Sequence, residues 1–176
     1  MGTYTAHMNT NKKFFIAKIM ADTNSYILKL NDEPFHYGHE VIIKTEQGTF
    51  LAHITSFPFE ETNTQNEKAI FLRYATTEDK AAEGDMDRKS IEIKREVSTL
   101  SKELSLGMNI THVLCSLDNY SITICYTAKG RVDFRKLLKV LKNRRNEKII
   151  MKQIGKKDRL NSFHIDQRLP INTYYR

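Results

Sequence analysis

The hydrophobic pattern of the chain changes near residue 75, and this change constrains the fold more than any other feature. Before it, five short segments rich in β-branched and aromatic residues are separated by turn residues, which is typical of strands. We expect strands at 14–20, 25–30, 40–45, 49–56 and 68–74, with a tight hairpin at Glu46-Gln47-Gly48. Short strands joined in this way predict a small, half-open antiparallel β-barrel.

After residue 75 the apolar residues recur at helical spacing. Thr76 is expected to cap a short helix, with Asp79 completing a capping box. Gly84 is expected to end that helix, and Asp85 to cap a longer one that ends near residue 105, just before Gly107. The longer helix has one apolar face, formed by Met86, Ile93, Val97, Leu100 and Leu104.

Two strands follow at 109–117 and 120–127, then a helix over 134–144 that Asp133 is expected to cap, and a closing strand at 147–154. This order predicts an α+β fold in which the barrel-like subdomain precedes an α-β-β-α-β sandwich layer. The expected boundaries are 1–12 for a tail or cloning remnant, 13–75 for the subdomain, 76–159 for the α+β domain and 160–176 for a tail.

The positive charge of the chain is concentrated in one segment. From Lys129 to Arg159 there are 13 Lys and Arg against 3 Asp and Glu, whereas the whole chain carries a net charge of only +7. A localised basic patch indicates an anionic partner, although a solvated helix face is the alternative. The candidate binding residues are Lys129, Arg131, Arg135, Lys136, Lys139, Lys142, Arg144, Arg145, Lys152, Lys156 and Lys157.

Gly130 and Arg131 stand just before the expected helix start, where unpaired backbone amides can face an anion. Arg131 and Lys129 could clamp a phosphate there, or Arg131 could pair with Asp133. Gly130 is expected to adopt a conformation that residues with a Cβ atom disfavour. Aromatic residues near the patch are few, so the pattern favours contacts to a nucleic-acid backbone over base recognition.

The two cysteines do not have metal-ligand spacing. If Asp118-Asn119 forms a two-residue turn, Cys115 lies opposite Ile122 and Cys125 lies opposite His112. The cysteines then point to opposite faces of the sheet, and we expect small buried hydrophobic residues rather than a disulfide. No cofactor, iron–sulfur cluster or structural zinc is expected, and the composition fits a reduced, cytoplasmic compartment.

No set of residues forms a convincing catalytic site, so the chain is not expected to be an enzyme. His36 and His39 are the nearest approach to a metal-binding pair, and His112 lies within an apolar strand. A phosphodiesterase that uses one of these histidines is the enzymatic alternative. No apolar run approaches the roughly 18 residues of a membrane span, so membrane insertion is not expected.

Three motifs resemble one known family. They are Arg73-Tyr74-Ala75-Thr76-Thr77-Glu78-Asp79, then Thr127-Ala128-Lys129-Gly130-Arg131-Val132-Asp133-Phe134-Arg135, and later Gln153-Ile154-Gly155-Lys156-Lys157-Asp158. In order and spacing they are similar to the polymerase-suppressor C-terminal conserved region of the bacterial YaaT/RicT proteins, and the match covers about residues 36–159. The resemblance implies that Thr76, Asp79, Gly130, Asp133, Phe134 and Gly155 belong to the structural motif.

The resemblance also implies a function. RicT-type proteins belong to a small complex that acts with the endonuclease RNase Y in mRNA processing, and kinetoplastid relatives belong to mRNA-binding factors. We therefore expect a non-enzymatic adaptor or regulator of RNA metabolism, with complex subunits or an endoribonuclease as protein partners and with RNA or DNA backbone as a further partner. RicT-type proteins continue into a cysteine-rich segment, whereas no cysteine follows Arg159 here. An autonomous nucleic-acid-binding protein, and a reduced mimic or competitor of a full-length regulator, are the alternatives.

Overall fold

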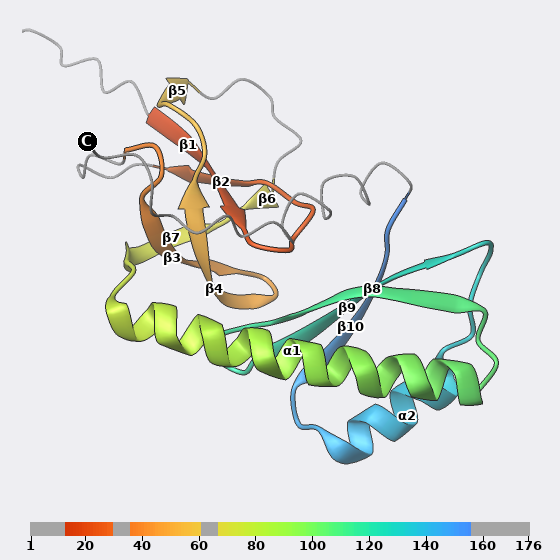
Figure 1. Cartoon of the computed structure of the whole chain (residues 1–176). Helices are drawn as coiled ribbons and strands as arrows, with labels where there is room; N and C mark the ends of the chain where they lie inside the picture. Colours follow the sequence, from red (N-terminus) through yellow and green to blue (C-terminus); the bar gives the residue numbers. More distant parts are fainter. Residues whose placement is uncertain (1–12, 30–35, 61–66, 156–176) are drawn as a thin grey trace, which may run out of the picture.

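The computed structural model describes residues 13–29, 36–60 and 67–155. It consists of a curled β-sheet, followed by two helices that pack on a smaller, second sheet (Figure 1). Five longer strands are antiparallel in the order β2-β1-β4-β3-β7. Their bounds are β1 Lys13–Ile19, β2 Tyr26–Lys29, β3 Glu40–Thr45, β4 Gly48–Ile54 and β7 Ile70–Tyr74. The short β5 Phe59–Glu60 pairs with β1, and β6 Glu67–Lys68 runs parallel to β2.

Alternating residues of these strands form one apolar cluster, which includes Phe15, Tyr26, Ile43, Phe50 and Ile54. The register between β3 and β7 shifts at Ile42 and Ile43, and such a bulge increases the twist of a sheet. The predicted half-open antiparallel barrel is therefore confirmed.

One continuous helix, α1 Thr77–Glu103, follows the barrel. The prediction that Gly84 ends a first helix and Asp85 caps a second is wrong, because Gly84 lies within α1 and Asp85 pairs with Arg88 on the same helix. A glycine within a helix costs only about 1 kcal/mol relative to alanine. Packing of the predicted apolar face against the second sheet, where Ile93 and Val97 are buried, outweighs that cost.

The second sheet has the order β10-β9-β8, with bounds β8 Met108–Cys115, β9 Ser121–Ala128 and β10 Lys148–Gln153. Strands β8 and β9 are antiparallel, while β9 and β10 are parallel and joined through α2 Arg135–Arg144. Both helices lie on the same face of this sheet (Figure 1), where Leu137 and Leu141 of α2 are fully buried. The predicted α+β order of helix, strand, strand, helix and strand is confirmed.

The predicted register of the β8–β9 hairpin is confirmed, since Cys115 pairs with Ile122 and Cys125 pairs with His112. Cys115 faces the helices, because it belongs to the same apolar cluster as Ile122. Cys125 lies on the opposite face, and both cysteines are free and buried. Burial raises the pKa of the Cys125 thiol to about 12, so this thiol is protonated at neutral pH.

The hairpin between β3 and β4 holds the two sheets together. The Leu117 amide donates to the Thr49 carbonyl at 2.8 Å, and the Ser121 hydroxyl donates to the Gln47 carbonyl. Gly48 has a φ of +125°, and a Cβ atom there would lie 2.7 Å from the Cβ of Ser116. The close approach of the sheets therefore requires glycine at this position.

None of the helices in the described part of the chain is both long and apolar enough to span a membrane.

Candidate functional site

The loop of residues 129–134 lies at the carboxyl end of the parallel strands β9 and β10. Gln153 pairs with Tyr126 in register, so both strands end at the same edge of the sheet. The Ile154 amide donates to the Tyr126 carbonyl at 2.9 Å and continues the pairing by one residue. Where parallel strands end and the connection to a helix begins, an open α/β sheet commonly leaves a crevice for a ligand.

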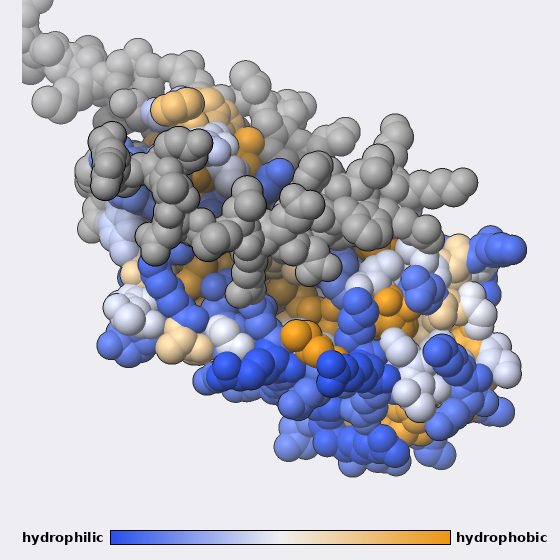
Figure 2. All heavy atoms as spheres, viewed as in Figure 1, coloured by the Kyte–Doolittle hydropathy of each residue, from blue (hydrophilic) through white to orange (hydrophobic). Residues whose placement is uncertain are grey.

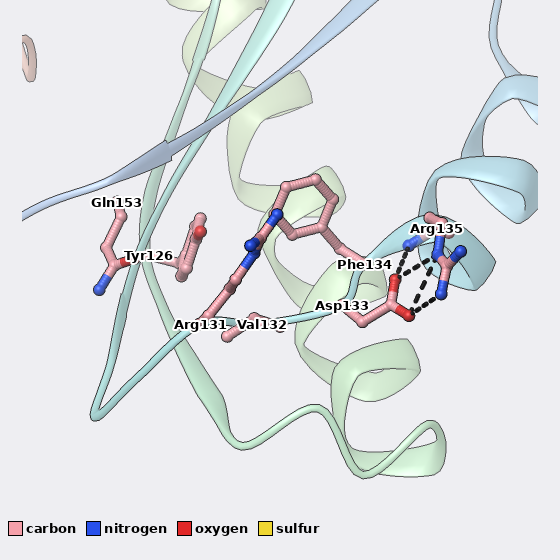
Figure 3. Close-up of a pocket in the computed structure, with 7 residues that line it drawn as sticks. All are labelled: Tyr126, Arg131, Val132, Asp133, Phe134, Arg135 and Gln153. Carbon is pink, nitrogen blue, oxygen red and sulfur yellow. Dashed lines mark hydrogen bonds and ion pairs between the residues drawn. The ribbon is translucent and has the colours of Figure 1, made fainter.

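Such a crevice is present, with a volume of about 760 Å³. The rings of Tyr126 and Phe134 meet edge to face, with 6.3 Å between their centroids. The Tyr126 side chain is on the face of the sheet that the helices cover and is buried, whereas Phe134 is half-buried. We call this feature the motif crevice; it is lined by Tyr126, Arg131, Val132, Asp133, Phe134, Arg135 and Gln153 (Figure 3).

Asp133 and Arg135 form a closed ion pair at the rim of the motif crevice. Asp133 Oδ1 accepts from the Arg135 backbone amide at 3.2 Å and from Nε at 2.9 Å, and Oδ2 accepts from Nη2 at 2.6 Å. The side-chain hydrogen bonds from Arg135 lower the pKa of Asp133 to about 2. The expectation that Asp133 caps α2 is wrong, because Phe134 is the N-cap and provides no side-chain hydrogen bond.

Arg131 takes no part in this pair. Among the described residues it makes no hydrogen bond or ion pair, and its side chain is exposed. Figure 3 shows Arg131 and Asp133 leaving the loop in different directions. The alternative of an Arg131–Asp133 pair is therefore not adopted, and one uncompensated guanidinium lies in the crevice.

Gly130 does not have the conformation predicted for it. The glycines with positive φ in the described part of the chain are Gly38, Gly48 and Gly107. A Cβ atom at Gly130 would meet nothing within 4 Å, so neither its backbone nor its surroundings require glycine. The strand therefore turns into the loop without left-handed backbone, and the prediction for Gly130 is wrong.

Five of the predicted binding residues lie in the loop between β9 and α2 and along α2 itself. We call them the basic surface; it consists of Lys129, Arg131, Lys136, Lys139 and Lys142. All five are exposed, and among the described residues none of them forms an ion pair. In Figure 2 hydrophilic residues cover most of the visible surface over α1 and α2. The basic surface is therefore available to an anion without breaking an internal contact.

Other predicted binding residues are held by carboxylates of the chain itself. Arg144 and Arg145 both pair with Glu96 of α1, so these arginines hold the two helices together. Lys152 is on the opposite face of the sheet, where its ammonium donates to Asp22 and Asn24 at 3.1 Å. Gly155 is the last described residue, and Lys156 and Lys157 lie outside the described residues.

The predicted capping box at Thr76 is confirmed, and it extends to Arg73. Asp79 accepts from the Thr76 amide at 2.8 Å and from Arg73 Nη2 at 2.8 Å. The hydrogen bonds from Arg73 hold the pKa of Asp79 well below its usual range, although burial opposes this shift. Arg73 is the penultimate residue of β7 and Asp79 lies in the first turn of α1, so their ion pair ties the barrel to the start of the helix.

The three candidate histidines do not lie together: two precede β3 of the barrel and one lies on β8 of the second sheet. His36 and His39 precede β3, with their rings edge to face at 5.0 Å, and the His36 amide donates to His39 Nδ1 at 3.3 Å. His112 lies on β8 beside Cys125; burial lowers its pKa, and its Nε2 atom is buried without a hydrogen-bond partner. Among the described residues, no group of three or more His, Cys, Asp and Glu side chains is placed to hold a metal ion.

Sequence reasoning missed two parts of the site. Gln153 and Tyr126 are 27 positions apart in the chain, and only the parallel pairing of β9 with β10 brings them together. The pairing of Arg144 and Arg145 with Glu96 depends on how α2 packs beside α1. Charge counting could not have found either feature.

Comparison with known proteins matches one family to the segment that contains this site. No curated protein and no solved structure matches the chain significantly. The family match begins at Ala69, next to β7, and continues to Ile154, just past β10. It includes the motif at 73–79, the motif crevice and the basic surface. Residues 69–154 of this chain are thus similar to the PSP1 C-terminal conserved region.

Proposed function

We propose that the protein is a non-enzymatic adaptor or regulator in RNA metabolism, which binds RNA through the basic surface and protein partners through other faces. The observation that carries the proposal is the unpaired state of the five cations of the basic surface, in a segment similar to the PSP1 C-terminal conserved region. Cations without internal partners are free to exchange their counterions for phosphates.

The carboxylates of the two sequence motifs support an adaptor rather than a catalyst. Asp133 is held by Arg135, and Asp79 is held by Arg73 and the α1 cap, so both acids act as structural anions with lowered pKa values. A general acid or base at neutral pH needs a pKa near 7.

The finer proposal is a RicT-like role, in which the protein associates with an RNase Y-type endoribonuclease and its complex. The sequence motifs at 73–79 and 127–135 support it. A competitor of a full-length regulator is the alternative that fits the same motifs. An affinity pull-down from host lysate, with and without nuclease, separates an adaptor from an autonomous RNA-binding protein. Partners that survive nuclease support an adaptor, and partners lost with the RNA support an autonomous RNA-binding protein.

The basic surface is tested by charge reversal. Lys139→Glu with Lys142→Glu should flatten the log–log salt dependence of RNA binding by roughly one to two units, because each phosphate contact contributes about 0.7–0.9. Lys44→Glu with Lys68→Glu is the matched control, since both lysines are exposed on the barrel. An unchanged slope in the first variant, with intact circular dichroism, would reject the basic surface as the RNA site.

A further inference from the structure

The motif crevice opens onto a groove that follows α2. A second hollow of about 500 Å³ is lined by Leu104, Leu106, Asp133, Arg135, Lys136 and Lys139. A third, of about 390 Å³, is lined by Arg135, Leu138, Lys139, Lys142 and Asn143. Arg135 borders all three hollows, so they adjoin one another. The surface therefore combines one aromatic end with a cationic track.

We propose that this groove selects single-stranded RNA, with one unpaired nucleotide inserted base-first into the motif crevice. The proposal rests on the proposed function and adds the form of RNA that is bound. The base lies against the Phe134 ring with its edge toward Gln153, and Arg131 contacts the adjoining phosphate. The neighbouring phosphates follow Lys136, Lys139 and Lys142.

The volume of the crevice supports this occupant. Cavities of about 300–1,000 Å³ hold small ligands, and the motif crevice, at about 760 Å³, is within that range. A paired base cannot enter such a space, because its edge and both of its faces are occupied within the duplex. A base of a single strand can be turned outward and inserted.

The chemistry of the lining matches a nucleotide. Aromatic rings provide stacking surfaces that accept any base, and a side-chain amide such as that of Gln153 can pair with a base edge. The charge at the crevice mouth is +1, since Asp133 neutralises Arg135 and leaves Arg131 uncompensated. An acidic peptide would satisfy the lysines of the track, but it has no flat ring to fill the aromatic end.

The position of the crevice relative to the track supports the same occupant. The cations of the track lie on one side of α2, at spacings of three residues from Lys136 to Lys142, and therefore form a line on the helix surface. A flexible strand can follow this line with its phosphates while one base turns into the crevice. The arrangement does not require base-specific contacts along the track.

The experiment measures the affinity of the full chain for a labelled single-stranded RNA, for its duplex and for the same strand with abasic positions. The single strand should bind at least tenfold more tightly than either of the others. Phe134→Leu keeps the apolar bulk but removes the ring, and should weaken single-strand binding roughly 5- to 100-fold while leaving duplex binding unchanged. Arg131→Ala, at an exposed residue without an internal partner, should also weaken single-strand binding selectively.

Lys139→Glu with Lys142→Glu is the comparison variant, because it should weaken the single strand and the duplex alike. Thermal melting establishes that each variant is folded, and Arg131→Ala keeps the test valid if Phe134→Leu is unstable. Equal affinity for single strand and duplex would overturn the inference while leaving the proposed function intact. If the unmodified protein binds no RNA at any salt concentration, both the inference and the proposed function are overturned. Tighter binding of an acidic polypeptide than of RNA would overturn the single-strand proposal.

Discussion

Asp133 shows how one residue can match a helix-cap pattern and still have another role. It precedes the N-cap Phe134 by one position, so its carboxylate reaches only the first helical amide, that of Arg135. The guanidinium of the same arginine supplies the remaining hydrogen bonds. The Asp133–Arg135 pair is therefore neutral overall, and of the two arginines that line the motif crevice only Arg131 has no ion-pair partner among the described residues.

The Asp133–Arg135 pair predicts an unusual titration. The folded pKa of Asp133 is about 2, below the ordinary value of 3.8, so any stability from the pair is fully present above pH 4 and is lost as the pH falls through 2. Carbon-13 NMR of the Asp133 carboxyl should give a midpoint near 2. Arg135→Ala should return the midpoint to the ordinary range. A midpoint that does not respond to Arg135→Ala would mean that another group holds the carboxylate.

Asp133→Ala should tighten RNA binding, because it releases Arg135 and removes a negative charge from the groove. This prediction rests on the proposed function and is measured as a steeper salt dependence. Asp87→Ala, which removes a carboxylate from α1, is the control and should leave the salt dependence unchanged. Weaker binding by Asp133→Ala would indicate that the pair positions the loop.

At the scale of elements, α1 is a single helix because its cap and its packing act together. The capping box at Thr76 satisfies the first turn, and Ile93 and Val97 anchor the middle against the second sheet. Gly84 lies between these two anchors, where a Cβ atom would meet nothing within 4 Å. The glycine is therefore a weak point within the helix that its surroundings tolerate.

Gly84→Ala should raise the free energy of unfolding by about 0.5–1 kcal/mol, because alanine restricts the unfolded chain and favours the helix. Urea denaturation measures the change. Gly107→Ala is the control and should lower stability, since its φ of +62° disfavours a side chain. A destabilised Gly84→Ala variant would argue for two helices that meet at a bend.

Thr76→Ala should lower the free energy of unfolding by about 0.5–2 kcal/mol, the cost of a lost N-cap hydrogen bond. Thr76→Ser keeps the hydroxyl and should retain most of the stability. If both variants melt like the unmodified protein, the Arg73–Asp79 pair alone fixes the start of α1.

For the whole molecule, the decisive contact is the one between the two sheets at Gly48. The β3–β4 hairpin lies against the β8–β9 turn, with Thr49 exchanging hydrogen bonds with Leu117 and Asp118. Lys152, paired with Asp22, adds an ion pair between the same two layers. The relative placement of the barrel and the crevice-bearing layer therefore depends on these polar contacts, on one close backbone approach and on the packing of Leu114 against the barrel's apolar cluster.

Gly48→Ala should destabilise the protein by more than about 1 kcal/mol, because its positive φ and the 2.7 Å approach to Ser116 both exclude a Cβ atom. Gly130→Ala is the matched control and should leave the melting temperature nearly unchanged. Hydrogen exchange at the Leu117 amide should rise in the first variant only. Equal melting temperatures for the two variants would show that the sheets can separate without loss of stability.

The sequence alone located the longer strands, α2 and several local partners, but it did not predict β5 and β6 and it divided α1 in two. Period-two and helical spacing located the strands and α2, turn residues fixed the pairing of Cys115 with Ile122, and a short-range motif located the Thr76 cap. These features depend on residues within a few positions of one another. The predicted break at Gly84 failed because packing of distant residues against the sheet outweighs a local helix-breaking preference.

Only the tertiary structure decided which charges are free and where a crevice forms. Glu96 pairs with Arg144 and Arg145 across two helices, and Asp22 pairs with Lys152 across two sheets, so a net charge of the segment could not separate paired from unpaired cations. The motif crevice exists because β10 returns parallel to β9 and brings Gln153 to Tyr126. Ion pairs and cavities depend on distances in space between residues that are far apart in the chain, and local patterns carry no information about those distances.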